Sequence, residues 1–155
     1  MVNIKNILDR ECTCANVDAA SRKRALEAAS DLLAEHHPDL SARALFDELM
    51  NRERLGSTGL GEGVAIPHCR IPCDRIVGAF LKLEEAIDYD AMDGEPVDLL
   101  FVLVVPPEET TAHLDVLAVL ARLFNNAENR DRLRAQDSNS ALYEELIGLV
   151  SNQAA

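Results

Sequence analysis

Residues 97–105 constrain the fold more than any other part of this 155-residue chain. Their sequence, VDLLFVLVV, is apolar at every position except Asp98. Such a run predicts a β-strand that is covered on both faces, and Pro106 and Pro107 end it. The apolar run from Leu99 to Val105 is far too short to cross a bilayer. We therefore expect other elements to cover both sides of a sheet that contains this strand.

Helix-forming patterns lie on either side of this strand. In residues 18–37, alanines and leucines recur every three or four positions and form one apolar stripe. Residues that cap or stop helices set the expected ends. The expected helices are 18–37, with Asp18 as N-cap and Pro38 as stop; 41–56, from Ser41 to Gly56; 111–124, capped by Thr110 or Thr111 and ended by Asn125 and Asn126; 128–135; and one that begins near Ser138.

The middle of the chain predicts further extended structure. Residues 56–67, GSTGLGEGVAIP, hold four of the seven glycines, which favours two short extended pieces joined by a tight turn at Gly61–Gly63. Residues 75–83, RIVGAFLKL, are typical of a strand. The order of helices, then strands, then helices predicts an α/β sandwich, a mixed β-sheet flanked by α-helices. The length fits one domain over residues 1–155.

The charge of the chain excludes some partners. It carries 15 Lys and Arg against 27 Asp and Glu, a formal net charge of −12. This argues against binding to nucleic acid, which needs clustered basic residues, and against an anionic membrane surface. It does not exclude one anionic ligand in a small basic pocket, because net charge describes the far field. The N-terminal segment has no apolar core of secretory-signal length, so we expect a cytoplasmic protein.

Four cysteines leave two interpretations open. In a cytoplasmic protein, Cys12, Cys14, Cys69 and Cys73 are expected to be free thiols. The alternative is a metal-binding protein that uses Cys69 and Cys73 together with His68 and His113. That ligand set is awkward, because adjacent side chains on a strand point to opposite faces, and the spacing is not the paired C-x2-C of a zinc ribbon.

Histidine 68 is the first candidate for chemistry. It follows the apolar segment 64–66 and Pro67, so its side chain is expected on a rigid strand end. The flanking glycines can leave amide groups pointing into an anion-binding concavity, and Arg52 lies upstream, where a guanidinium can grip a phosphate. The other interpretation is a glycine-rich hairpin with a partly buried, hydrogen-bonded histidine. These residues alone do not decide between the two.

The other histidines differ in their settings. His113 is expected at the N-terminus of the helix 111–124, where the helix dipole favours a neutral imidazole and attracts anions. His36 and His37 end the first predicted helix, before Pro38, and we interpret both as surface or capping residues.

Residues 52–68, RERLGSTGLGEGVAIPH, strongly resemble the signature of the enzyme IIA proteins of the fructose–mannitol–nitrogen class, the type-2 enzyme IIA domains of the bacterial phosphoenolpyruvate-dependent phosphotransferase system. Within that class the segment is most similar to the nitrogen-regulatory enzyme IIA, whose motif is R-E-x-L-G-S-T-G-x-G-x-G-x-A-I-P-H. Residues 96–101, then Val105-Pro106 and His113-Leu114, match the second block of the family. The resemblance implies a mannitol-type enzyme IIA fold over residues 1–155.

The resemblance also implies a phosphorelay without metal or cofactor. His68 matches the histidine that accepts a phosphoryl group on Nε2 from an HPr-like phosphocarrier protein of the nitrogen branch, and His113 matches the assisting histidine. Arg52 matches an active-site arginine. Ser57 and Thr58 match hydroxyl residues of the same block, which we interpret as phosphate-binding.

Two outputs are compatible with this relay. The first is regulation of nitrogen- and potassium-linked targets, such as sensor kinases or potassium transporters, through the phosphorylation state. The alternative is a sugar-specific enzyme IIA, for fructose or mannitol, that passes the phosphoryl group to an enzyme IIB. The R-E-x-L-G-S-T-G form of the motif favours regulation. Cys69 departs from the family, which commonly carries glycine there; we interpret it as a neutral substitution rather than a redox site.

Overall fold

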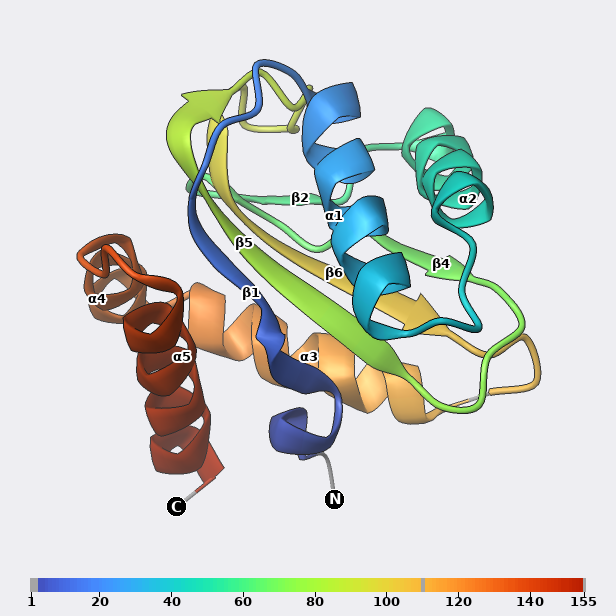
Figure 1. The fold of residues 1–155 in the computed structure, drawn as a ribbon. Coiled ribbons are helices and arrows are strands. Elements are labelled where there is room, and N and C mark those ends of the chain that lie inside the picture. Colours follow the sequence, from blue (N-terminus) through green and yellow to red (C-terminus); the bar gives the residue numbers. More distant parts are fainter. Residues whose placement is uncertain (1–2, 110, 155) are drawn as a thin grey trace.

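The computed structural model describes residues 3–109 and 111–154. In this described part of the chain, six strands form one sheet, and five α-helices and one short 3-10 helix accompany it. Figure 1 shows their arrangement. The elements in chain order are η1 (Ile4–Asn6), β1 (Leu8–Val17), α1 (Arg22–His36), α2 (Ala42–Leu55), β2 (Gly59–Gly61), β3 (Val64–Ala65), β4 (His68–Arg70), β5 (Val77–Ile87), β6 (Val97–Val105), α3 (Ala112–Phe124), α4 (Ala127–Arg134) and α5 (Asn139–Ala154).

The sheet is mixed, and helices cover both of its faces. Its strand order is β1-β5-β6-β3-β2, and β4 also pairs with β6. The β1/β5 and β6/β3 pairs are parallel, whereas β5/β6 and β2/β3 are antiparallel. Figure 1 shows α1 and α2 on one side of the sheet and α3, α4 and α5 on the other. The predicted α/β sandwich is therefore confirmed.

Strand β6 is the centre of the core, as its apolar sequence predicts. Every residue from Val97 to Val105 is buried except Asp98, which is half-buried. Phe101 of this strand packs on Phe80 of β5, and Phe80 packs on Phe124 of α3, each with ring centroids 5.9 Å apart. Burying one such apolar side chain contributes roughly 1.5–3 kcal/mol, so the two-sided burial fixes β6 firmly in place.

The pairing of β3 and β4 places His68 beside this central strand. Both short strands run parallel to β6, with Val64 opposite Leu99 and His68 opposite Leu103. They behave as one strand interrupted at Pro67, which has no N–H to donate to a ladder. The carbonyl of Pro67 still accepts a hydrogen bond from the Leu103 amide at 2.9 Å. His68 therefore lies on the sheet and not on a loop.

A tight turn joins β2 to β3, as the glycines predict. Gly61 and Gly63 have positive φ angles of +95° and +82°, and Glu62 between them has φ +58°. At these angles a side chain is strained, and glycine adopts them freely.

The N-terminal part of the chain differs from the sequence-based prediction. Strand β1 was not predicted, so the order of helices before strands is wrong: the chain begins its fold with an edge strand of the sheet. Helix α1 begins at Arg22 and not at 18. Its N-cap is Ser21, whose side chain accepts a hydrogen bond from the Arg24 amide at 3.2 Å, so Asp18 does not cap it. The strand predicted at 75–83 begins two residues later and extends to Ile87.

The remaining caps are mostly as predicted. Ser41 and Ser138 accept hydrogen bonds from Ala44 and Ala141 at 3.2 and 3.1 Å, which starts α2 and α5. At α3 the N-cap position is Thr111, but its side chain makes no capping bond. A carboxylate oxygen of Glu109 accepts from the Ala112 amide at 3.0 Å instead. Thr110, the alternative cap, lies outside the described residues.

Within the described residues, no helix combines the length and the apolar character that a membrane crossing needs.

Candidate active site

His68 is held with one defined ring nitrogen available for chemistry. It is the first residue of β4 and is half-buried. Its Nδ1 lies 2.9 Å from the backbone oxygen of Ile66. A carbonyl oxygen can only accept, so in the neutral ring Nδ1 carries the proton and Nε2 keeps its lone pair. Nε2 is therefore the nucleophilic nitrogen of this histidine.

Arg70 follows His68 on β4 and contacts His113. It was not predicted from the sequence as a site residue. It stands two residues after His68 on β4, so both side chains project from the same face of the strand. Its Nη2 lies 3.3 Å from Nε2 of His113. Its Nη1 donates to the backbone oxygens of Pro106, Pro107 and Glu109 at 3.1, 3.3 and 2.6 Å. The guanidinium is thereby fixed between β4 and the start of α3.

His113 lies in the first turn of α3, where the helix presents its positive dipole end. Burial, the charge of Arg70 and then that of His68 lower the pKa of His113 below its ordinary value, and Glu109 opposes this weakly. A guanidinium only donates, so Nε2 of His113 accepts from Arg70 and the proton resides on Nδ1. The structure thus brings together His68, Arg70 and a neutral His113 at the ends of two elements.

Arg52 lies on the helix beside this strand. It occupies the last turn of α2, which packs against β4 (Figure 1). Its Nη1 donates to the backbone oxygen of Gly56 at 2.8 Å and so helps to terminate its own helix. Arg52 is half-exposed, and its guanidinium has further donors for an anionic ligand.

The hydroxyls of Ser57 and Thr58 bond to protein groups. The Ser57 hydroxyl accepts from the Gly59 amide at 3.1 Å. Thr58 is buried, and its hydroxyl donates to the carboxylate of Glu53. Among the described residues, no hydrogen bond joins either hydroxyl to His68 or His113. That they bind phosphate stays a prediction, and it requires these bonds to rearrange.

The cysteines do not form a metal site. All four are free thiols, as predicted. In the described part of the chain, no group of three or more His, Cys, Asp or Glu side chains is placed to hold a metal ion. Cys69 is buried, and burial, then Glu48 and Cys73, raise the pKa of its thiol to about 12. The metal-binding alternative therefore has no geometric support, and a reactive thiol beside His68 has none either.

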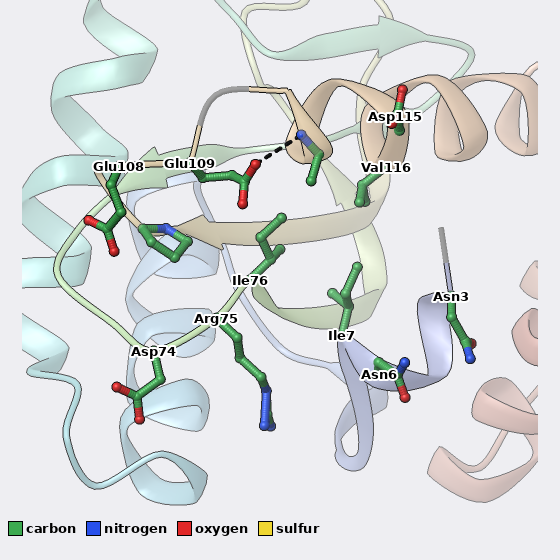
Figure 2. Close-up of a pocket in the computed structure, with 12 residues that line it drawn as sticks. Asn3, Asn6, Ile7, Asp74, Arg75, Ile76, Glu108, Glu109, Asp115 and Val116 are labelled. Atoms are coloured by element: carbon green, nitrogen blue, oxygen red, sulfur yellow. Dashed lines mark hydrogen bonds between the residues drawn. The ribbon is translucent and has the colours of Figure 1, made fainter. Parts of the chain in front are cut away.

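A cavity of about 540 Å³ lies beside the segment that joins β6 to α3, which contributes Pro106, Glu108 and Glu109 to its lining (Figure 2). Four carboxylates line it, together with one arginine, Arg75; they belong to Asp74, Glu108, Glu109 and Asp115. None of His68, Arg70 and His113 lines it. An acidic cavity repels a phosphoryl group. The candidate active site is therefore the group of His68, Arg70 and His113, which lies outside this cavity.

The other two histidines have structural roles. The backbone N–H of His37 caps α1 by donating to the Leu33 oxygen at 2.8 Å, and its Nε2 lies 3.7 Å from a carboxylate oxygen of Asp9. His36 ends the same helix and is exposed. Both agree with the predicted surface or capping role.

Comparison with known proteins identifies the class. Residues 6–148 match the family described as phosphoenolpyruvate-dependent sugar phosphotransferase system, EIIA 2. The chain belongs to this family, whose members are phosphotransferases.

Within the family the chain is similar to nitrogen regulatory proteins. It is 42% identical over 154 residues to the nitrogen regulatory protein of Pseudomonas aeruginosa, covering 99% of this chain and 100% of that protein. The crystal structure of the nitrogen regulatory protein IIA-Ntr from Neisseria meningitidis superposes with a TM-score of 0.84 at 39% identity, over 95% of this chain and 98% of that one. The predicted resemblance to nitrogen-regulatory enzyme IIA is confirmed.

A more distant structure supports the fold alone. The IIA mannitol protein of Escherichia coli superposes with a TM-score of 0.69 at 18% identity, over 97% of this chain and 99% of that one. The mannitol-type enzyme IIA fold expected from the sequence is therefore present.

Proposed function

We propose that this protein is a single-domain cytoplasmic phosphorelay component that accepts a phosphoryl group on Nε2 of His68 from an HPr-like phosphocarrier of the nitrogen branch. The observation that carries the proposal is the 2.9 Å hydrogen bond from Nδ1 of His68 to the Ile66 oxygen. It leaves Nε2 unprotonated, as attack on phosphorus requires. No cofactor or metal enters the proposed step.

The proposed transfer is an in-line displacement. The lone pair of His68 Nε2 forms a new N–P bond while the N–P bond of the carrier's phosphohistidine breaks, and its electron pair stays on the carrier nitrogen. The transferred group is loose and metaphosphate-like, so the protein mainly positions it and stabilises its charge. Arg70 and Arg52 offer cationic donors for its oxygens.

His113 supports the transfer without becoming the stable acceptor. Its Nε2 faces Arg70 at 3.3 Å, which keeps the guanidinium beside the phosphoryl position. Its lowered pKa favours the neutral ring, whose Nε2 accepts the hydrogen bond from Arg70. We also propose that Ser57 and Thr58 contribute to phosphate binding, although in this conformation they order the glycine-rich segment.

The proposed output is regulatory. Phosphorylation adds negative charge at the half-buried His68, and target proteins can distinguish the two forms through that change. We propose nitrogen- and potassium-linked targets such as sensor kinases or potassium transporters, in line with the similarity to nitrogen regulatory proteins. The alternative, phosphoryl transfer to a sugar-specific enzyme IIB, predicts rapid loss of label to such a domain.

The direct test is phosphorylation by a radiolabelled phospho-HPr-type carrier. The native chain is expected to gain one acid-labile, base-stable phosphate, and His68→Ala none. His36→Ala removes an exposed histidine elsewhere and serves as the matched control, with native labelling. Equal labelling of the native chain and His68→Ala would refute the assignment.

A further inference from the structure

The buried carboxylate of Glu53 is outside the proposed transfer step. Glu53 follows Arg52 in the last turn of α2, yet its side chain has 0% exposure. Its two oxygens accept hydrogen bonds from the Thr58 amide at 3.1 Å, from the Thr58 hydroxyl and from the Tyr89 hydroxyl at 3.1 Å. Nη1 of Arg22 lies 3.8 Å away. The partners of this carboxylate therefore lie outside α2: Thr58 in the glycine-rich segment 56–67, and Tyr89 and Arg22 in other parts of the chain.

This arrangement is costly for a carboxylate. Burial removes its hydration, and the C-terminal end of a helix presents negative potential to it. Buried ion pairs of this kind contribute little net stability and serve in some proteins to specify one arrangement. The electrostatic influence of Glu53 extends to Tyr89, because burial and this carboxylate raise the pKa of the Tyr89 hydroxyl.

A continuous path of hydrogen bonds joins Glu53 to the reactive imidazole. Glu53 holds the backbone amide and the hydroxyl of Thr58. The carbonyl of Thr58 accepts from the Ile66 amide at 3.1 Å, across the β2/β3 hairpin. The carbonyl of Ile66 accepts from Nδ1 of His68 at 2.9 Å. The position of the Ile66 carbonyl thus depends on the position of Thr58, and that depends on Glu53.

We propose that Glu53 is a positioning residue that fixes the Nδ1–H tautomer and the orientation of His68 through Thr58 and Ile66. This inference rests on the proposed function, since the orientation matters for phosphoryl transfer from a carrier. Glu53 touches neither the reacting nitrogen nor the phosphoryl group. Its effect is therefore expected on the rate of transfer within the docked complex and not on docking.

Glu53→Gln removes the charge and retains the shape of the side chain. We expect kcat for transfer from the phospho-carrier to fall by about 10- to 100-fold, the range seen when a supporting hydrogen-bond partner is removed. KM for the carrier is expected to stay within about two-fold, because Glu53 is absent from the surface. Asp47→Asn makes the same charge change at an exposed position of α2 and should keep native kcat and KM.

A second readout needs no phosphorylation. Imidazole nitrogen chemical shifts report the tautomer of His68, and we expect mainly Nδ1–H in the native chain and a mixture in Glu53→Gln. A native chain that accepts no phosphate would refute the proposed function, and the tautomer comparison would still decide the role of Glu53. A native tautomer in Glu53→Gln, with or without a change in kcat, would overturn the positioning role.

Substitutions at Thr58 cover the case in which Glu53→Gln does not fold. Thr58→Val removes the hydroxyl at constant shape, and Thr58→Ser restores it. We expect Thr58→Val to mix the tautomers of His68 in the absence of any phosphoryl group, and Thr58→Ser to keep mainly Nδ1–H; this readout is independent of the phosphate binding proposed for the Thr58 hydroxyl. If the two variants behave alike, the path through Thr58 is wrong. When Glu53→Gln and Thr58→Val are combined, the losses of the Nδ1–H tautomer should be less than additive, because both act through one path.

Discussion

Gly63 offers a quantitative test of the β2/β3 turn, which precedes the strand that carries His68. Its φ is +82°, where an alanine costs roughly 1–2 kcal/mol. An added Cβ would lie 2.5 Å from Nη2 of Arg134, 3.1 Å from Oδ1 of Asp98 and 3.3 Å from the Pro96 oxygen. The flexible end of Arg134 must therefore move when Gly63 becomes alanine.

That movement breaks two hydrogen bonds. Nη2 of Arg134 donates to the Glu62 oxygen at 2.8 Å and to Oδ1 of Asp98 at 2.9 Å. The Arg134 and Asp98 side chains are 30% and 22% exposed, so water replaces part of what is lost. The loss of these two hydrogen bonds should lower the free energy of unfolding by about 1–2 kcal/mol. Gly63→Ala should therefore destabilise the protein by about 2–4 kcal/mol in total, or roughly 4–16 °C in Tm for a chain of this size.

Two other glycines separate the contributions. Gly94 has φ +75° with nothing within 4 Å of an added Cβ, so Gly94→Ala should cost only the backbone strain, about 1–2 kcal/mol. Gly148 lies in α5, also with nothing within 4 Å, and Gly148→Ala should stabilise by about 0.5–1 kcal/mol.

Urea unfolding followed by circular dichroism measures all three variants, since the chain has no tryptophan for fluorescence. If Gly63→Ala loses no more stability than Gly94→Ala, an added Cβ at Gly63 does not displace Arg134.

Four further predictions test other parts of the structure. Arg70→Gln should raise the pKa of His113 toward its ordinary value, because a nearby positive charge is removed; a proton NMR titration that shows no change would contradict the contact. The lowered pKa means that His113 binds a proton less tightly in the folded protein than in the unfolded chain. Its contribution to the free energy of unfolding is therefore complete above about pH 6.5 and is lost as the pH falls. Arg70→Gln should reduce that loss of stability. At pH 8, iodoacetamide should label the half-exposed Cys73 long before Cys69, whose pKa is raised to about 12; mass spectrometry that finds the reverse order would contradict the burial of Cys69. Ser41→Ala should cost about 1 kcal/mol by removing the cap of α2, and an unchanged Tm would exclude that cap.

The parts of the fold that follow from local chemistry were predictable, and strand β1 was not. The apolar run at 97–105 predicts strand β6, and the glycines at 56–63 predict the β2/β3 hairpin. In β1, the successive residues Asp9, Arg10 and Glu11 are charged and lie half-buried or exposed at the edge of the sheet. Register shifts in the β1/β5 ladder further disrupt the two-residue alternation that marks a strand. Its place depends on pairing with a strand about 70 residues later, which no local pattern encodes.

The same distinction applies to the candidate site. His68 and His113 could be selected from the chemistry of histidine, a rigid strand end and a helix N-terminus. Arg70 becomes relevant only when the carbonyls after β6 meet its guanidinium, 36 to 39 residues along the chain. Its spacing of two from His68 on a strand was the available signal. In the sequence, Glu53 is one of several charged residues at the polar end of a helix, which indicates an exposed side chain. Only the tertiary structure shows that it is buried.

The interrupted strand that carries His68 has a consequence for protein engineering. Segment 52–70 looks like a portable peptide, since it contains the whole glycine-rich signature. Yet its register comes from β6, and the orientation of Arg70 comes from the backbone that follows β6. Grafted onto another scaffold, the segment would keep its residues and lose their geometry. A transplant that retains the geometry of His68 and Arg70 would have to move β6 and the start of α3 with it.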